Sequence, residues 1–123
     1  MEKQHAQSGN GYNVFASKCP SRKLLNDVTT RWGILVLTTL LNGSARYSQI
    51  RDRIDGISDR MLSLTLSTLM QDRLVTKALT TEAGAYELTE AGSTIARQGL
   101  EFFDSLYRCL DQLEADGDNP SPR

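Results

Sequence analysis

The sequence predicts a mainly α-helical fold that carries one small β-hairpin, an α+β class. Two observations lead to this prediction: apolar residues recur at helical spacing over most of the chain, and over residues 74–89 the spacing changes to alternate positions. The length of 123 residues fits one domain. We expect a flexible leader over 1–17, one domain over 18–115 and a disordered tail over 116–123, because both ends are polar and rich in residues that favour disorder.

Two helices are expected before the centre of the chain. Pro20 suits the first position of a helix, since its missing N–H has no partner there in any case. The segment 31–41 is nearly all apolar and should form a buried helix, with Thr30 as its N-cap and Asn42–Gly43–Ser44 as its end.

Two short helices should follow. The third begins at Ser48 as its presumed N-cap and ends before a turn in which Gly56 can take a positive φ. Ser58 is expected to cap the fourth. Its inner face consists of leucines spaced at i, i+4 and i+7, namely Leu62, Leu66 and Leu69.

The hairpin and the last helix complete the prediction. Val75 and Leu79 on one strand, and Tyr86 and Leu88 on the other, sit at even spacings and can share a face. Thr89 should cap a long final helix. Two short helices joined by a glycine turn and followed by a hairpin form a winged helix-turn-helix, whose fourth helix fits the major groove of DNA.

Several motifs also match a known family. They are CP at 19–20, RW at 31–32, ILVLTTLLNG at 34–43, RYSQIRDRIDGISDRML at 46–62 and YELTEAG at 86–92. In order and spacing the chain resembles the HxlR-type winged helix-turn-helix regulators over about 19–106. The resemblance implies a dimeric DNA-binding regulator that acts on a nearby promoter, often as a repressor. The chain departs from the pattern at Arg73, where the family usually has glycine, and in a wing that lacks proline and keeps mainly Lys77.

The candidate DNA contacts follow from this fold. On the fourth helix, Arg60, Ser63, Leu64 and Ser67 point away from the leucine face, and such N-terminal positions reach base edges. Leu64 could contact a thymine methyl or be an incidental exposed leucine. Groups before and around this helix could meet phosphates. The full set of expected DNA-binding residues is Arg46, Ser48, Gln49, Arg51, Ser58, Arg60, Ser63, Leu64, Ser67 and Lys77. Trp32 and Tyr47 are expected to pack in or beside the core.

Cys19 precedes Pro20 at a helix start and is flanked by Lys18, Arg22 and Lys23. A helix N-terminus and nearby cations both stabilise a thiolate, so we expect a lowered thiol pKa. By resemblance to family members that sense quinones, aldehydes or oxidants, Cys19 is a candidate redox or electrophile sensor. The alternative is a small, partly buried residue at a helix cap. Cys109 is expected to pack against the apolar stripe of the last helix.

The last helix carries an apolar seam at 3- and 4-residue spacing, formed by Phe103, Leu106, Leu110 and Leu113. One small domain does not need so long a seam, so a symmetric helix–helix homodimer is expected. The alternative is that this helix folds back on its own domain. A two-fold dimer predicts a pseudo-palindromic operator.

Charge and composition narrow the function classes. Net charge is −1; residues 46–77 carry six basic and four acidic groups (+2), and residues 82–118 carry two basic and nine acidic groups (−7). A locally basic middle can still bind a polyanion. We find no paired catalytic groups, phosphate loop or zinc spacing, and therefore expect no enzyme, metal or cofactor. Without an apolar span or signal sequence, a cytoplasmic protein is expected. A winged helix used only for protein–protein interaction is the alternative function.

Overall fold

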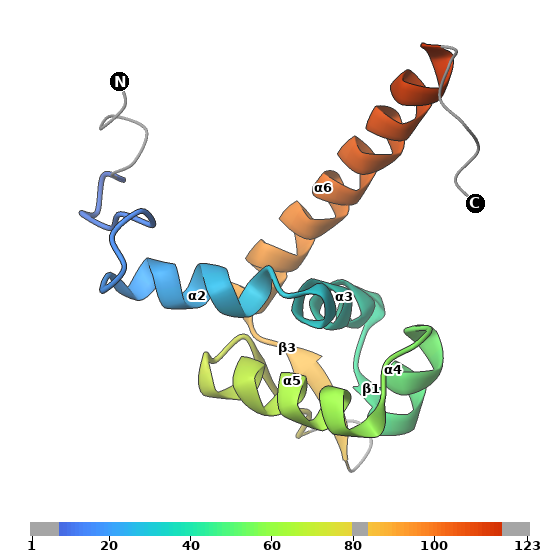
Figure 1. The fold of residues 1–123 in the computed structure, drawn as a ribbon. Coiled ribbons are helices and arrows are strands. Elements are labelled where there is room, and N and C mark those ends of the chain that lie inside the picture. The colour runs from blue at the N-terminus through green and yellow to red at the C-terminus, as the bar shows by residue number, and fades with distance from the viewer. Residues whose placement is uncertain (1–7, 80–83, 117–123) are drawn as a thin grey trace.

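The computed structural model describes residues 8–79 and 84–116, and it confirms a mainly helical domain with a small antiparallel sheet (Figure 1). The elements in chain order are α2 (Pro20–Val28), α3 (Arg31–Thr39), the 3-10 helix η1 (Leu40–Asn42), β1 (Ala45–Arg46), α4 (Tyr47–Arg53), α5 (Asp59–Gln71), β2 (Val75–Lys77), β3 (Ala85–Leu88) and α6 (Glu90–Ala115). The expected leader residues 1–7, hairpin tip 80–83 and tail residues 117–123 lie outside the described residues.

Three helices begin at the residues predicted as their N-caps. The Thr30 hydroxyl accepts a hydrogen bond from the Gly33 N–H, and the Ser58 hydroxyl accepts one from the Met61 N–H. The Thr89 hydroxyl likewise accepts the N–H of Gly92 at 3.0 Å. Each bond satisfies a backbone donor that the helix itself cannot pair.

The start predicted for α4 is wrong. This helix begins at Tyr47, and Arg46 is its N-cap. The side-chain oxygen of Gln49 accepts the Arg46 N–H at 2.8 Å, so it satisfies a donor of the entering chain. Ser48 therefore lies inside the first turn, where it is exposed.

The sheet has three strands in the order β1–β3–β2, both pairs antiparallel. The short β1 was not expected; it pairs Ala45 with Tyr86. In the expected hairpin Val75 pairs with Leu88. Leu79 lies beyond the end of β2 and is 91% exposed, so it does not share the buried face of Val75.

The core lies between α3, α5 and the sheet. All three predicted leucines of α5 are buried, and they pack with the α3 residues Val36 and Leu37. Trp32 and Tyr47 pack against this cluster from its edge, as predicted. Gly56 takes a φ of 88° between α4 and α5, so the predicted glycine turn is confirmed.

Arg73 follows the end of α5 with a φ of 63°, a left-handed conformation that glycine adopts at little cost. Its N–H donates to the Met70 carbonyl, and the N–H of Leu74 donates to the Leu69 carbonyl. These two bonds close the helix. The geometry explains why glycine would suit this position better than arginine.

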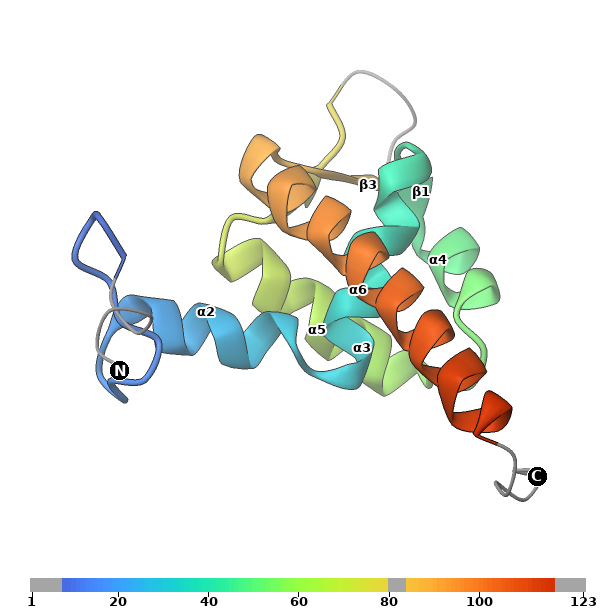
Figure 2. The same cartoon turned by 90° about the horizontal axis from the view of Figure 1, so that it is seen from above.

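The long helix α6 has two different halves. Its first half is buried through Gly92, Ala96 and Gly99, and a Cβ added at Gly92 would lie 2.0 Å from the Leu74 carbonyl oxygen. Its second half extends beyond the rest of the domain, as Figures 1 and 2 show. None of the helices in the described part of the chain is long and apolar enough to span a membrane.

Candidate nucleic-acid interface

The outward face of α5 carries the four side chains predicted there. Arg60, Ser63, Leu64 and Ser67 are exposed, while the opposite face of the same helix is buried in the core. The helix-turn-helix therefore presents one charged, two hydroxyl and one apolar side chain on a single accessible surface. Donors, acceptors and methyl groups of these kinds are suited to base edges in a major groove.

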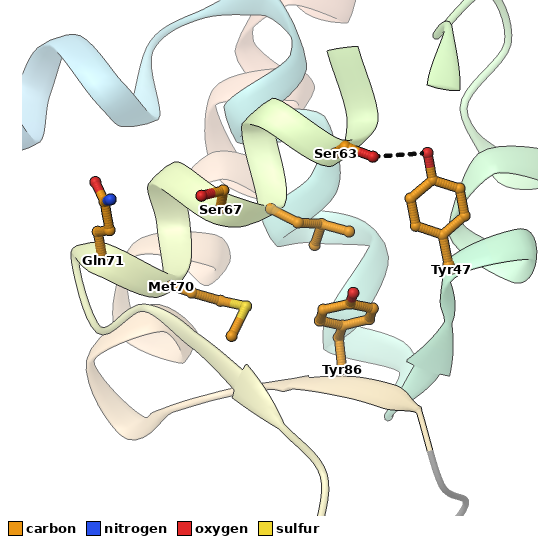
Figure 3. A pocket seen from close by; sticks show the side chains of 7 residues that line it. Tyr47, Ser63, Ser67, Met70, Gln71 and Tyr86 are labelled. Carbon is orange, nitrogen blue, oxygen red and sulfur yellow. Dashed lines mark hydrogen bonds between the residues drawn. The ribbon is translucent and has the colours of Figure 1, made fainter. Parts of the chain in front are cut away.

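Side chains from α4 hold the first turns of α5 in place. The Tyr47 hydroxyl donates to the Asp59 carbonyl oxygen at 2.8 Å and lies 3.1 Å from the Ser63 hydroxyl (Figure 3). The Arg51 guanidinium donates to the Asp59 carboxylate at 3.0 Å. Arg51 thus has a partner within the protein, and its structural role is to join the two helices.

The other predicted contacts differ in whether their side chains already serve a helix cap. The oxygens of Ser58 and Gln49 serve as helix caps. Ser48 and Arg46 are exposed at the start of α4. A backbone phosphate placed there would meet a hydroxyl, a guanidinium and the end of a helix.

A hollow of about 440 Å³ separates α5 from the sheet (Figure 3). Its lining residues are Tyr47, Ser63, Leu66, Ser67, Met70, Gln71 and Tyr86. Lys77 lies at its wing side, with the ammonium group 5.0 Å from the centre of the Tyr86 ring. Three groups on this surface were not predicted as DNA contacts, namely Gln71, Tyr86 and the hydroxyl of Tyr47. Gln71 had a signal, since it lies one turn after Ser67, but Tyr86 is brought here only by strand pairing.

Leu64 lines a smaller hollow on the other side of α5. This hollow measures about 140 Å³ and is bounded by Trp32, Thr30 and Asp27 as well as by Thr65 and Thr68. The Leu64 side chain is 56% exposed. Leu64 thus lies at the edge of the exposed surface of α5, next to the α2–α3 turn.

Residues 27–114, which include the whole of this surface, match the HxlR-like helix-turn-helix family. The chain belongs to the HxlR-like helix-turn-helix family. It is 37% identical over 106 residues to the HTH-type transcriptional regulator YtfH of Escherichia coli, and the match covers 84% of each chain. Among solved structures it resembles a putative transcriptional regulator ytfH from Salmonella typhimurium, with a TM-score of 0.74, 32% identity and coverage of 88% of this chain and 99% of that one.

The quinone-bound structure of YodB from Bacillus subtilis is also similar, with a TM-score of 0.58, 27% identity and coverage of 76% of this chain and 98% of that one. The protein is thus a transcriptional regulator with a DNA-binding helix-turn-helix. The exposed face of α5 described above lies within the residues that match this family.

Cys19 of the HxlR-like chain is partly buried at the start of α2. The Asn13 backbone N–H donates to its sulfur at 3.3 Å, and the Ser21 hydroxyl donates at 3.2 Å. These bonds, together with the Ser21 backbone N–H, lower the pKa of the Cys19 thiol, and burial opposes them only weakly. The direction agrees with the sequence prediction.

Of the two predicted causes, the helix N-terminus contributes through the Ser21 backbone N–H, whereas Arg22 and Lys23 bond to other groups. Arg22 donates to the carbonyl oxygens of Val14 and Phe15 at 2.6 and 2.8 Å, which folds the preceding segment back over the start of α2. Lys23 bonds to Asp27 and Asp72. Backbone amides and one hydroxyl, not cations, stabilise the thiolate.

Lys23, Asp27 and Asp72 form a cluster that joins α2 to the end of α5. Burial raises the pKa of Asp72, and the neighbouring Asp27 raises it further. Burial alone would also raise the pKa of Asp27, but hydrogen bonds from Lys23 and Asp72 lower it. One oxygen of Asp72, Oδ2, is buried without a partner among the described residues. The two carboxyl groups therefore differ in acidity, and Asp72 holds its proton longer.

The second half of α6 exposes the predicted seam. Phe103 is partly exposed, and Leu106, Leu110 and Leu113 are each about half exposed. The helix does not fold back to cover them (Figure 2). Cys109 lies on the same segment and is exposed in the single chain, so its predicted packing beside the apolar stripe depends on the predicted dimer. Where α6 leaves the domain, an apolar hollow of about 290 Å³ lies between Thr29, Ile34, Ile95 and Phe102.

Proposed function

We propose that the protein is a homodimeric repressor that binds a pseudo-palindromic operator, and that modification of Cys19 alters this binding. The observation that carries the proposal is the exposed reading face of α5, with Arg60, Ser63 and Ser67 directed away from a fully buried leucine face. A helix anchored on one side and polar on the other is the arrangement that direct readout in a major groove requires.

The dimer part of the proposal rests on α6. Its exposed seam of Phe103, Leu106, Leu110 and Leu113 recurs at the 3- and 4-residue spacing by which two helices interdigitate. Pairing with the same helix of a second copy, related by a two-fold axis, would bury this surface in both copies. The two reading helices would then face half-sites about 10 bp apart, or a multiple of that spacing.

The effector part of the proposal rests on the lowered pKa of Cys19. A larger thiolate fraction near neutral pH raises the rate of attack on electrophiles and oxidants. The relative YodB has been observed with bound quinone. We infer that a quinone-like electrophile or an oxidant is the class of effector for this chain as well.

The test is fluorescence anisotropy with labelled random and own-promoter duplexes over a salt series, with and without diamide. We expect selective binding whose log affinity falls with log salt at about 0.9 per phosphate contacted, and loss of affinity on oxidation. Cys19→Ser should abolish the response to diamide and leave binding to DNA intact.

Cys109→Ser is the matched control, because Cys109 is an exposed thiol on α6, outside the helix start that holds Cys19. A response that survives Cys19→Ser and disappears in Cys109→Ser would contradict the proposed sensor and leave the regulator standing. Absence of selective binding even at low salt would contradict the operator proposal.

A further inference from the structure

We propose that Tyr47 fixes the hydrogen-bonding direction of Ser63, so that Ser63 can only accept in the DNA groove and selects a base that presents an amino group, adenine or cytosine. This inference rests on the proposed DNA-reading function of α5. It goes further by assigning Tyr47 a role in specificity and by naming the chemistry that Ser63 reads.

The Tyr47 hydroxyl has a single proton to donate. Its oxygen lies 2.8 Å from the backbone carbonyl oxygen of Asp59. A carbonyl oxygen can only accept, so Tyr47 must donate its one proton there. The Tyr47 oxygen then has only lone pairs for its second neighbour.

The second step concerns Ser63. Its hydroxyl oxygen lies 3.1 Å from the Tyr47 oxygen, and the geometry alone allows either atom to be the donor (Figure 3). Since the Tyr47 proton is already used, Ser63 must be the donor in this contact. A serine has one hydroxyl proton, so only acceptor lone pairs remain on the exposed side of Ser63.

The pair is held in this arrangement from several sides. The Tyr47 ring packs against the hydrophobic core, and Asp59 is tied to α4 a second time by the guanidinium of Arg51 at 3.0 Å. The Tyr47 oxygen therefore cannot move away from the Asp59 carbonyl without losing packing, and turning its proton elsewhere would leave two acceptor oxygens 2.8 Å apart. Ser63 sits in the second turn of α5 and is itself exposed.

The acceptor that remains discriminates between bases in the major groove. Adenine presents its N6 amino group and cytosine its N4 amino group, and both can donate to Ser63. Guanine presents N7 and O6 and thymine presents O4, all acceptors, which would meet the Ser63 lone pairs with no proton between them. A serine with a freely rotating hydroxyl would accept either class.

Ser67 provides the contrast within the same helix. It is exposed one turn further on and lines the same hollow, yet its hydroxyl has no hydrogen-bond partner among the described residues. Ser67 should therefore both donate and accept, and it should discriminate little between the two classes of base.

The test begins with selection of binding sites from a random duplex library by the wild-type protein and by Ser63→Ala and Ser67→Ala. We expect Ser63→Ala to relax one operator position at which the wild type prefers adenine or cytosine by about fivefold, the value of one hydrogen bond. A wild-type preference for guanine or thymine at the position that depends on Ser63 would overturn the proposal. So would an unchanged selection by Ser63→Ala, although sequence-specific binding itself would then still stand.

The role of Tyr47 is tested with Tyr47→Phe, which keeps the packed ring and removes the hydroxyl, and with Tyr86→Phe as the control from the same hollow. Tyr47→Phe returns the Ser63 proton to the groove, so guanine or thymine at the same position should gain about fivefold relative to the wild type. Tyr86→Phe should not change that position.

Base analogues remove the remaining ambiguity. Replacing the selected adenine by purine, or the selected cytosine by 2-pyrimidinone, deletes the amino group alone. The wild type should lose about fivefold in affinity and Ser63→Ala should lose none. An equal loss in both proteins would show that another residue reads the amino group and would overturn the assignment. A wild type that selects no sequence would remove both this inference and the proposed function.

Discussion

At the start of α5 the Ser58 hydroxyl pairs the free Met61 N–H, and Asp59 places a negative charge in the first turn, where the helix dipole favours it. At the end of the same helix a buried carboxyl group, Asp72, leaves one oxygen unpartnered, and Arg73 adopts a left-handed backbone. The first end is stabilised by local interactions, whereas the second end costs free energy locally and is held by its neighbours. The candidate DNA contacts Arg60 and Ser63 lie near the stable end.

The end of α5 therefore depends on contacts with other helices. The carbonyl oxygens that follow the strained end are bonded by α6, since the Thr89 hydroxyl donates to Arg73 and the Thr89 N–H donates to Leu74. Lys23 of α2 bonds to Asp72 from the other side. The end of α5 is thus kept in place by tertiary contacts, whereas its start has a side-chain cap of its own in addition to the contacts from α4.

Gly92→Ala should have the largest effect on the contacts that hold the end of α5. Its Cβ would lie 2.0 Å from the Leu74 carbonyl oxygen, and the backbone there cannot move without losing the bond to Thr89. We expect the free energy of unfolding to fall by about 3 kcal/mol or more, measured by urea denaturation.

Gly99→Ala is the matched control in the same helix, since the nearest atoms to its Cβ would be side-chain carbons of Thr38 and Ile34, at 2.9 to 3.3 Å, rather than backbone. The better helix propensity of alanine should offset most of that crowding, to within about 1 kcal/mol. Equal losses in the two variants would contradict the special role of the Leu74 contact.

Ser58→Ala removes the cap at the stable end. It should lower the free energy of unfolding by about 1 kcal/mol, because the Met61 N–H loses its side-chain partner. Thermal and urea unfolding both measure this loss. Ser67→Ala, an exposed serine inside the same helix, should cost nothing; a similar loss there would mean that the effect at Ser58 is not one of capping.

Arg73→Gly should relieve the strained end. We expect a gain of somewhat under 1 kcal/mol, because glycine avoids the left-handed penalty but loses more chain entropy on folding. Gln71→Gly, two residues earlier and inside the helix, should instead cost up to about 1 kcal/mol. A loss in both variants would show that Arg73 is held by its side chain rather than tolerated for its position.

Asp72→Asn should change the free energy of unfolding least at any single pH. Its effect should appear as a change in how that free energy varies with pH. The raised pKa of Asp72 contributes stability below the ordinary aspartate value of about 3.9, and this contribution is lost as the pH rises through the folded-state pKa. The substitution should therefore become more favourable, relative to the wild type, as the pH rises from about 4 to the folded-state pKa of Asp72, and level off above it.

Asp27→Asn should give the opposite slope, because the pKa of Asp27 is lowered and its contribution is lost as the pH falls. Urea denaturation of the three proteins at a series of pH values measures both slopes. Parallel slopes in the two variants would contradict the unequal sharing of charge between these carboxyl groups.

The sequence was sufficient for the elements that depend on local chemistry. The caps at Thr30, Ser58 and Thr89 are hydroxyl residues that stand just before segments with apolar residues at helical spacing. The spacing of the three leucines of α5 is enough to predict its buried face. The outward position of Arg60, Ser63 and Ser67 follows from the same periodicity.

Interactions between distant residues could not be predicted in this way. The two-residue strand β1 exists only because it pairs with β3, and Tyr86 reaches the hollow beside α5 by that same pairing. The bond between Tyr47 and Ser63 joins residues 16 positions apart. The predicted start of α4 is wrong because the chain enters this helix at Arg46, whose N–H donates to the side-chain oxygen of Gln49.

The backbone clamp made by Arg22 has a consequence for how the protein ages. The Asn13 N–H reaches the Cys19 sulfur because Arg22 holds Val14 and Phe15 back against α2. A protease that cut the chain between Phe15 and Lys18 would release this amide while leaving every DNA-facing residue in place. If the proposed function holds, the clipped protein would bind the same operator but lose part of the acidity of the Cys19 thiol, so it would respond more slowly to an electrophile.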